Sequence, residues 1–375
     1  MTGTDRLRLA FIGNPSSVHL QRWVNYFAGR GHAVWVLDGF SSPPTTALDR
    51  RITLVRYDAW GPLRFPGASV IHARRELRRI LRHLAPDVLH AHSVKRYGWQ
   101  AGLAGFHPYV ISTWGSDVLL RGESWRSRFW HRRTLSRADI VTAVSEHMRE
   151  AAMAAGAHSD RVVQIQFGVD TQRFVPAAVP VSTLERYGLH SGSFVFSPRI
   201  VRPLYNHETI TAAFAQLGTS YQLVMTGRNA DGEYLKRLMA GLARHGVAAC
   251  VRVIDDISDE DMLALYQSAG VVVSAPISDS FPITLLEAMA CGTPIVAGDL
   301  PPVRAELEDL VPESLVPTFD PTAMAAAMRR VLELPAERRR TLGTALRERA
   351  VTTADFETNM LRMEGVYREL TARSH

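Results

Sequence analysis

Short apolar runs alternate with longer amphipathic segments along the whole chain. In the first half, this pattern predicts strands at 7–12, 32–37, 52–57, 88–91, 109–113 and 138–144, with helices at 18–29 and 70–84. Such short apolar runs are typical of strands that are buried on both faces. Their alternation with helices predicts a parallel sheet that is covered by helices on both sides.

A second alternating set follows a break at 174–180, where two prolines and small residues are typical of a linker. It predicts strands at 194–197, 222–226, 251–254, 271–274 and 294–297, helices at 208–217, 234–244 and 259–268, and a closing helix at 355–370. We therefore expect an α/β protein of two doubly wound, Rossmann-like domains, 1–175 and 176–354, with the C-terminal helix 355–375 packing back on the first domain. A ligand should bind at the carboxyl ends of the strands, in a cleft between the domains.

Length and composition agree with a two-domain globular protein. The chain has 375 residues, too many for one ordinary core, and 46% of them are hydrophobic. No run reaches the roughly 20 apolar residues of a membrane span. Residues 1–8 lack the apolar core of a signal peptide, so we expect a cytoplasmic location. The two cysteines, Cys250 and Cys291, suggest neither a disulfide framework nor a zinc site.

The formal net charge of +6 comes almost entirely from arginine, with lysine only at positions 95 and 236. One interpretation is a bias in coding composition. The other is an anionic partner, such as a phosphate compound or a lipid surface. No recognised nucleic-acid-binding motif is present, so we expect no nucleic acid partner. For the oligomeric state, we expect a monomer or a homodimer.

The most informative segment is 279–294, with the sequence DSFPITLLEAMACGTP. Its two carboxylates, Asp279 and Glu287, flank a short loop and the first turn of a predicted helix that ends at Gly292. The backbone N–H groups at the start of such a helix can receive phosphate oxygens. Carboxylates accept hydrogen bonds from hydroxyl groups. A ligand that places an anion at the helix start and hydroxyl groups at the two acids has the chemistry of a nucleotide-sugar.

The chain resembles the retaining GT-B glycosyltransferases of family 4 over most of its length, and most strongly at this segment, where the family carries two acids separated by seven residues. The resemblance implies a GT-B fold and transfer of a hexose or N-acetylhexosamine from a nucleoside-diphosphate sugar, UDP rather than GDP, without metal or cofactor. It places Asp279 beside the transferred sugar and Glu287 on the ribose hydroxyls. Asp279 is one methylene shorter than the usual Glu. The alternative for Glu287 is a residue that caps or solvates a helix.

The loop between the two acids is expected to contact the donor. Phe281 occupies a family position. Pro282 stands where the family usually has glycine, and it has no N–H to offer a phosphate. Ile283 and Thr284 would then supply the backbone donors, and Thr284 could add its hydroxyl.

Arg199 follows a predicted strand and resembles the phosphate-binding arginine of the family. Its forked guanidinium suits a pyrophosphate, and the alternative is a surface salt bridge. Most members place a lysine a few residues later, which this chain lacks. Either Arg202 or Asn206 takes over, or fewer charges hold the leaving group. Gly227 resembles the glycine loop near the nucleotide, and the segment 254–257 should lie beside the base.

Several N-terminal residues also match family positions. Gly13 permits close approach of the backbone to a ligand. His19 and His92 are candidate acceptor contacts, against the alternatives of a helix-start residue and a core histidine. Trp114 stands where many relatives have a histidine that contacts the donor sugar. Tryptophan can stack on a sugar but cannot shuttle a proton, so Asp117 is expected to carry part of the polar role.

Two further patterns have both a functional and a structural interpretation. The acids at 259–261 fit the Asp-x-Asp pattern of metal-dependent transferases, but they follow Ser258, a predicted cap, and favour the helix dipole. We interpret them as structural.

Segment 125–133 interleaves aromatics with arginine, which suits an anionic membrane surface. Its aromatics at 125, 129 and 130 also have the spacing of the buried face of an amphipathic helix. We favour the core, with peripheral contact at the inner membrane face as the alternative.

Two other functions stay open at this point. One is a nucleotide-sugar epimerase or hydrolase on the same scaffold, which would need further acids and bases around the sugar. The other is an inactive homologue that only binds a nucleotide-sugar, because positions 114, 206 and 279 depart from the family pattern. A dinucleotide oxidoreductase is disfavoured, since no G-x-G-x-x-G follows the first strand.

Overall fold

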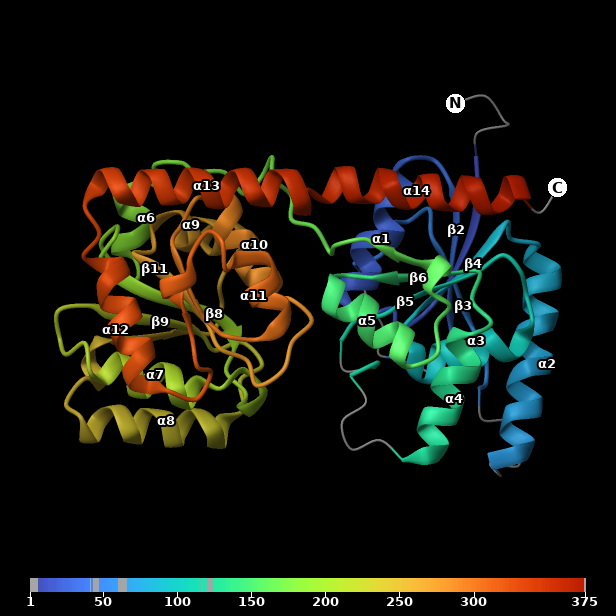
Figure 1. Ribbon diagram of the computed structural model, residues 1–375, viewed down its shortest axis with the longest axis horizontal. Coiled ribbons are helices and arrows are strands. Elements are labelled where there is room, and N and C mark those ends of the chain that lie inside the picture. The colour runs from blue at the N-terminus through green and yellow to red at the C-terminus, as the bar shows by residue number, and fades with distance from the viewer. Residues whose placement is uncertain are drawn as a thin grey trace. The chain divides into compact units, whose positions relative to one another are not determined.

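A computed structural model describes residues 6–40, 42, 47–59, 66–115, 117–119 and 124–373, and it divides the chain into two compact units (Figure 1). Unit 1 comprises Met1–Gln166 and Thr358–His375, and unit 2 comprises Phe167–Glu357. Residues 1–5, on which the expected lack of a signal peptide partly rests, lie outside the described part, as does Ser116. Among the described residues, no helix is both long enough and apolar enough to span a bilayer.

Unit 1 contains a parallel sheet with the strand order β3-β2-β1-β4-β5-β6-β7. Its strands are β1 (Arg8–Ile12), β2 (Ala33–Asp38), β3 (Thr53–Arg56), β4 (Val88–His92), β5 (Tyr109–Ser112), β6 (Ile140–Ala143) and β7 (Val162–Gln164). Its helices are α1 (Val18–Gly29), α2 (Pro66–Leu84), α3 (Trp99–Ala104), α4 (Trp125–Leu135) and α5 (Glu146–Ala154), with a π-helical turn at Val94–Gly98 and a 3₁₀ turn at Ser159–Arg161. The strand order reverses between β1 and β4, which makes their carboxyl ends the expected binding crevice of this unit.

Unit 2 repeats this design with the order β10-β9-β8-β11-β12-β13. Its strands are β8 (Phe194–Ile200), β9 (Gln222–Thr226), β10 (Val251–Ile254), β11 (Val271–Ser274), β12 (Ile295–Gly298) and β13 (Leu315–Val316). Its α-helices are α6 (Val181–Glu185), α7 (His207–Ala215), α8 (Gly232–Arg244), α9 (Asp259–Ser268), α10 (Ile283–Ala290), α11 (Pro301–Leu307), α12 (Pro321–Leu332) and α13 (Ala336–Ala354). Short 3₁₀ turns occupy Pro203–Tyr205, Ala248–Cys250 and Pro312–Ser314. Here the order reverses between β8 and β11, and the sequence pattern had not predicted α6, α11, α12, α13 or β13.

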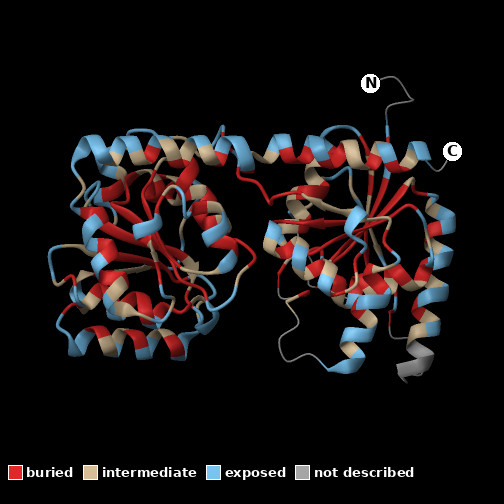
Figure 2. Ribbon diagram, viewed as in Figure 1, coloured by how far each residue is buried: buried red, intermediate tan, exposed pale blue. Residues whose placement is uncertain are grey.

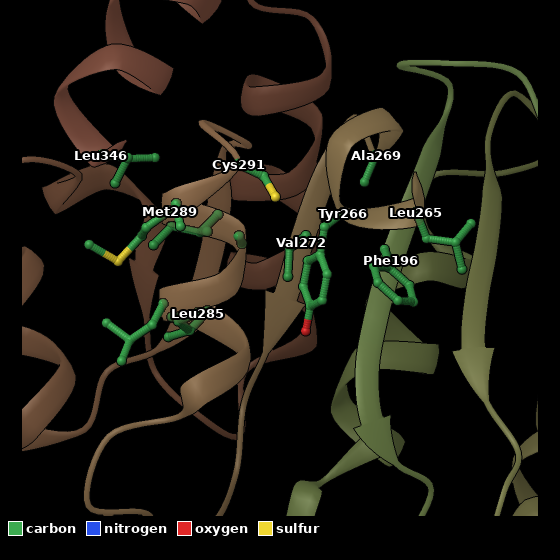
Figure 3. Packing of buried hydrophobic residues seen from close by; sticks show 14 of the residues in the cluster. Phe196, Leu265, Tyr266, Ala269, Val272, Leu285, Met289, Cys291 and Leu346 are labelled. Atoms are coloured by element: carbon green, nitrogen blue, oxygen red, sulfur yellow. The ribbon is translucent and has the colours of Figure 1, made fainter. Parts of the chain in front are cut away.

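The strands of unit 2 are buried on both faces, as Figure 2 shows by their red colour. Along β8, Phe194 and Phe196 join one hydrophobic cluster and Val195 joins the other, because successive side chains of a strand point to opposite faces. The first cluster includes Leu285 of α10 and Leu346 of α13, and Figure 3 shows both leucines on the same side of Tyr266. The predicted doubly wound α/β architecture is therefore confirmed.

The last helix, α14 (Phe356–Arg373), places Tyr367 in the core of unit 1. The Tyr367 hydroxyl and His90 Nδ1 form a hydrogen bond of 2.5 Å, and His90 Nε2 lies 2.8 Å from Ser112 Oγ. Ser112 in turn contacts Thr142 Oγ1 at 2.7 Å. Burial lowers the pKa of His90 to about 3, so the imidazole stays neutral. One buried chain of hydrogen bonds thus joins α14 to β4, β5 and β6.

Tyr367→Phe should destabilise the protein by about 1–3 kcal/mol, because it leaves a buried imidazole nitrogen without its partner. Urea unfolding followed by circular dichroism measures this loss. Tyr221→Phe is the matched control, since the Tyr221 hydroxyl forms no hydrogen bond within the described residues. Equal unfolding midpoints for both variants and the parent would contradict a stabilising role for the buried chain.

Candidate functional site

Arg199 and Asp279, predicted as separate contacts to the donor, form an ion pair in unit 2. Arg199 Nη2 lies 2.8 Å from Asp279 Oδ2, and the two side chains are only 17% and 14% exposed. Arg199 belongs to the irregular end of β8, where the register with β9 shifts between Ser197 and Ile200. Asp279 lies in the loop after β11. The pair therefore stands at the point where the strand order of this sheet reverses.

Each member of this pair has further partners. Burial raises the pKa of Asp279, while Arg199 and the backbone N–H groups of Ser280 and Phe281 oppose that rise. The guanidinium carbon of Arg199 lies 4.1 Å from the centre of the Tyr205 ring, which is cation–π geometry. Arg199 Nε is buried and has no hydrogen-bond partner. Arg199 is thus held in place while one of its donors is unused.

The loop after Asp279 leads directly into α10. Pro282 is the N-cap residue and provides no side-chain cap. Its carbonyl accepts a hydrogen bond from Leu285 N at 3.0 Å. The Thr284 hydroxyl is buried without a partner, and Ile283 is half-buried. The first turn of α10 therefore holds a buried hydroxyl that has no partner among the described residues.

Glu287 lies one turn further along α10 and contacts Tyr266 of α9. The Tyr266 hydroxyl donates a hydrogen bond of 2.5 Å to Glu287 Oε2. Burial and the Glu287 charge both raise the pKa of Tyr266 well above its usual value. Figure 3 shows Tyr266 packed between Val272 and Phe196 in the hydrophobic core. Sequence analysis missed Tyr266, because its apolar surroundings make it look like any other core residue.

Three predicted donor contacts have other partners here. Phe281 is 1% exposed and belongs to the hydrophobic core. Asn206 is 5% exposed, and its amide donates to Thr318 O at 2.8 Å and accepts from Thr209 Oγ1 at 3.0 Å. Arg202 donates to the Asn229 carbonyl at 3.3 and 3.1 Å. Both candidate substitutes for the family's lysine thus have partners within unit 2.

Gly227 closes β9 beside the predicted base-binding segment. Its N–H donates to Ile254 O at 2.8 Å. A Cβ at this position would overlap Asp255 Oδ1 and lie 2.9 Å from Val253 Cγ1. Glycine is therefore needed to leave room for the Asp255 carboxylate. This contact brings together the glycine loop and the segment 254–257.

In unit 1, the predicted residues His19, His92, Trp114 and Asp117 line one cavity of about 330 Å³. Trp114 stacks on His19 with ring centres 5.2 Å apart and an interplanar angle of 19°. His92 is 6% exposed, and neither ring nitrogen has a partner among the described residues. Burial, with the His90 and His19 charges, lowers the pKa of His92 well below its usual value. A neutral imidazole with two unused nitrogens thus borders this cavity.

Gly13 makes room for that histidine. It follows β1, and a Cβ at position 13 would lie 3.2 Å from His92 Cβ and 3.1 Å from Leu20 Cδ2. These are tighter than ordinary van der Waals contacts, so a side chain at position 13 would push on both residues. The glycine that was predicted to allow close approach of a ligand here allows close approach of His92.

Asp117, predicted to share the catalytic role of Trp114, binds the backbone. Its Oδ2 accepts from Val94 N at 2.9 Å, and its Oδ1 accepts from Trp114 N at 2.9 Å and Gly115 N at 3.0 Å. The side chain ties the loop after β4 to the loop after β5. This use of both oxygens favours a positioning role over direct contact with substrate.

Lys95 and Arg96 also line this cavity, and sequence analysis missed them as site residues. They belong to the π-helical turn at Val94–Gly98, in which Arg96 has a φ of 52°. The preceding Ser93 has a φ of 127° and a ψ of 143°. Because this turn has no regular sequence pattern, only the two adjacent basic residues could have signalled it.

The acids at 259–261 have the predicted structural role. Ser258 caps α9 by accepting a hydrogen bond from Asp261 N at 3.0 Å. The Asp261 carboxylate accepts from Arg186 at 2.5 Å and from Tyr187 at 2.8 Å. Within the described ranges, no group of three or more His, Cys, Asp or Glu is arranged to hold a metal ion.

The predicted core placement of the aromatics at 125–130 is wrong. Trp125 and Phe129 are 69% and 55% exposed. Trp130 is half-buried, and its ring centre lies 6.4 Å from the ring centre of Trp99. The buried residues of α4 are His131, Thr134 and Leu135. This face packs against α3, where a Cβ at Gly102 would stand 3.6 Å from Thr134 Cα, at ordinary van der Waals distance.

Comparison with known families agrees with this geometry in both units. The family model "Glycosyl transferases group 1" matches residues 191–349, and "Glycosyl transferase 4-like" matches residues 8–145. The chain belongs to the group 1 glycosyl transferases. The first match contains Arg199, Asp279 and Glu287, and the second contains the residues that line the cavity of unit 1.

This group 1 glycosyl transferase is similar to a curated D-inositol 3-phosphate glycosyltransferase of Nocardiopsis dassonvillei. The two are 30% identical over 266 residues, which cover 68% of this chain and 60% of that protein. The matched part of the chain thus spans less than two thirds of the length of that relative.

Solved structures show the same fold at low sequence identity. A glycosyltransferase from Rickettsia africae has a TM-score of 0.83 and 16% identity, and the match covers 97% of this chain and 98% of that one. Anabaena Alr3699/HepE in complex with UDP and glucose has a TM-score of 0.80 and 18% identity, covering 97% and 100%. The glycosyl transferase therefore has the GT-B fold.

The Arg199–Asp279 pair should show energetic coupling. Arg199→Gln leaves a largely buried carboxylate without its cation, so Asp279→Asn in the same chain should restore part of the lost stability. We expect a coupling energy of roughly 0.5–3 kcal/mol from a double-mutant cycle measured by urea unfolding. Because removing Arg199 raises the pKa of Asp279 further, the deficit of Arg199→Gln should shrink as the pH falls through that pKa.

The control is the exposed pair Lys236–Glu233, whose side chains are 76% and 80% exposed and whose coupling should be close to zero. If the stability effects of the Arg199 and Asp279 substitutions simply add, with a coupling energy no larger than that of this control, the two charges do not stabilise one another.

Proposed function

We propose that this protein transfers a hexose or N-acetylhexosamine from a nucleoside-diphosphate sugar to an acceptor nucleophile, with retention of configuration. The observation that carries this proposal is the arrangement at the β8/β11 reversal, where Arg199 Nε and the Thr284 hydroxyl are both buried without partners. Buried polar groups are nearly always paired, so two unused donors at one reversal point indicate a polar ligand. Membership of the group 1 glycosyl transferases makes a diphosphate the ligand of choice.

Departure of the nucleoside diphosphate is the step that these donors serve. Arg199 can supply two N–H groups to a phosphate, and the backbone N–H groups at the start of α10 favour the same anion. Asp279 now holds Arg199, and a bound diphosphate would compete for that guanidinium. The Asp279 carboxylate would then be available to the positive charge that develops on the sugar. This arrangement supplies positive charge without metal, and we include metal independence in the proposal.

The nucleoside would be held by the remaining groups of unit 2. Glu287 is proposed to accept hydrogen bonds from the ribose hydroxyls, with Tyr266 fixing its carboxylate. Gly227 and Asp255 are proposed to lie beside the base. We favour UDP over GDP, which agrees with the structure of the Anabaena protein in complex with UDP and glucose.

The acceptor is proposed to bind in the 330 Å³ cavity of unit 1. The unused nitrogens of His92 and the stacked rings of Trp114 and His19 suit a hydroxylated compound, because aromatic faces and hydrogen-bonding groups together recognise sugars and polyols. His92 is a poor general base, because a strongly lowered pKa makes its imidazole a weak proton acceptor. We propose that the departing phosphate itself takes the acceptor proton.

A donor screen tests the reaction class. The purified protein is incubated with UDP-glucose, UDP-N-acetylglucosamine and GDP-mannose, without acceptor and then with hydroxylated acceptors, among them D-inositol 3-phosphate. We expect slow release of free sugar and nucleoside diphosphate without acceptor, faster release with the right acceptor, an α-linked product from an α-linked donor, and activity that survives EDTA. Interconversion of nucleotide-sugars would instead identify an epimerase, and binding without turnover would identify an inactive homologue.

Substitution of the two acids should separate binding from turnover. Glu287→Gln keeps an acceptor for the Tyr266 hydroxyl but removes the charge, and it should weaken UDP binding roughly tenfold to hundredfold. Asp279→Asn should chiefly lower turnover. Calorimetry with UDP and steady-state rates measure the two effects, with Glu185→Gln as the exposed control. Unchanged UDP affinity in Glu287→Gln would sink the ribose assignment.

A further inference from the structure

The outer face of α4 combines exposed aromatic side chains with arginines. Trp125 and Phe129 are four positions apart and share one face of the helix, opposite the buried His131 and Leu135. Arg126, Arg128, Arg132 and Arg133 are all exposed on the arc around them. Figure 2 shows the N-terminal turns of α4 largely in the colour of exposed residues. This helix therefore presents its largest apolar side chains to solvent within a ring of positive charge.

Within the described part of the chain, the arginines of α4 form no ion pair. The helix itself contains no acidic residue. The guanidinium of Arg126 lies instead 5.4 Å from the Trp125 ring. Like charges that stand together without counter-charges repel one another, so such a cluster is expected where an anionic partner binds.

Helix α2 extends this surface within the same unit. Both α2 and α4 pack against α3, and Figure 1 shows them on the same side of unit 1. Burial lowers the pKa of Arg137, which follows α4, and the charges of Arg133 of α4 and Arg74 of α2 lower it further. Helix α2 also carries the exposed Ile71, and its one acid, Glu76, pairs with Arg79 at 3.0 Å.

We propose that the outer face of α4, with Trp125, Arg128, Phe129 and Arg132 at its centre, docks on the surface of a bilayer that contains anionic lipids. The aromatics would enter the interfacial region while the arginines contact lipid phosphates. A soluble anion would satisfy the arginines but not the aromatics. A second copy of this face would bring arginine against arginine, so self-association through it is disfavoured.

This surface is independent of the proposed sugar transfer. Its centre lies on α4, whereas the residues proposed to bind donor and acceptor follow the carboxyl ends of the strands. Binding to lipid can therefore be measured without any assay of transfer, and failure of either proposal leaves the other standing.

Sedimentation with vesicles tests the proposal on the full chain. The parent should bind vesicles of phosphatidylglycerol mixed with phosphatidylcholine, should not bind phosphatidylcholine alone, and should be released by high salt. Arg128→Gln with Arg132→Gln should weaken binding by about fivefold for each arginine removed. Trp125→Ser with Phe129→Ser should remove most of the remaining affinity. In the parent, tryptophan emission should shift to shorter wavelengths on binding, because Trp125 leaves water.

Matched controls come from unit 2. Phe319 is 65% exposed and lies outside any basic helix, so Phe319→Ser should bind as the parent does. Arg338→Gln with Arg340→Gln removes two exposed arginines of α13 and should change binding little. Circular dichroism and unfolding midpoints confirm that each variant folds.

Several outcomes would overturn the proposal. These are equal binding to neutral and anionic vesicles, no binding to either, or parent-like binding by the α4 variants. The proposal also fails if light scattering shows the parent to be a dimer that Trp125→Ser with Phe129→Ser dissociates, since the face would then belong to a second copy. Binding without any shift in emission would contradict insertion of Trp125.

Discussion

Strands that are buried on both faces leave polar groups very few positions in this molecule. A polar side chain inside a strand must find a partner within the core, as His90 does with Tyr367 and Ser112. Side chains at the carboxyl ends of the strands escape this requirement. His92 is the last residue of β4 and keeps two unpaired nitrogens, and the irregular end of β8 carries Arg199 with its unpaired Nε. The parallel sheets thus concentrate unused hydrogen-bonding capacity at the strand ends where the topology reverses.

Much of this arrangement follows from the sequence, because apolar runs reveal buried strands and the residues just after them must lie at one edge of the sheet. Arg199, Asp279 and His92 could be found in that way. Their partners could not be, since a hydrogen bond depends on the exact path of the chain. Asn206 and Asp117 look like ligand-binding residues in the sequence, but turn geometry directs their side chains to backbone groups. The sequence around Tyr266 is typical of a core residue, and its ring does lie in the core. Only its hydroxyl contacts Glu287.

The sequence did not reveal helix α13, and its packing explains why. Helix α13 buries Gly343, Leu346, Ala350 and Ala354, so its inner face is mostly small and gives little apolar periodicity. Small residues serve there because α13 packs very closely on the end of α10, where a Cβ at Gly343 would overlap the Gly292 carbonyl. Helix α4 shows the opposite case, in which the strongest apolar signal belongs to the outer face. Periodicity identifies a face, but only packing determines which face turns inward.

The turn that carries Lys95 and Arg96 has one more consequence. Ser93 and Arg96 hold positive φ angles that non-glycine residues rarely adopt, each at a cost of about 1–3 kcal/mol. Asp117 binds the Val94 amide within this turn, and Gly98 leaves room for the Ser93 carbonyl, where a Cβ would collide. Glycine at either strained position would relieve the backbone while loosening the wall of the cavity. Substitutions that stabilise the protein at these two positions would therefore loosen the turn that lines the cavity. Adaptation to a higher temperature would have to use stabilising substitutions elsewhere in the chain.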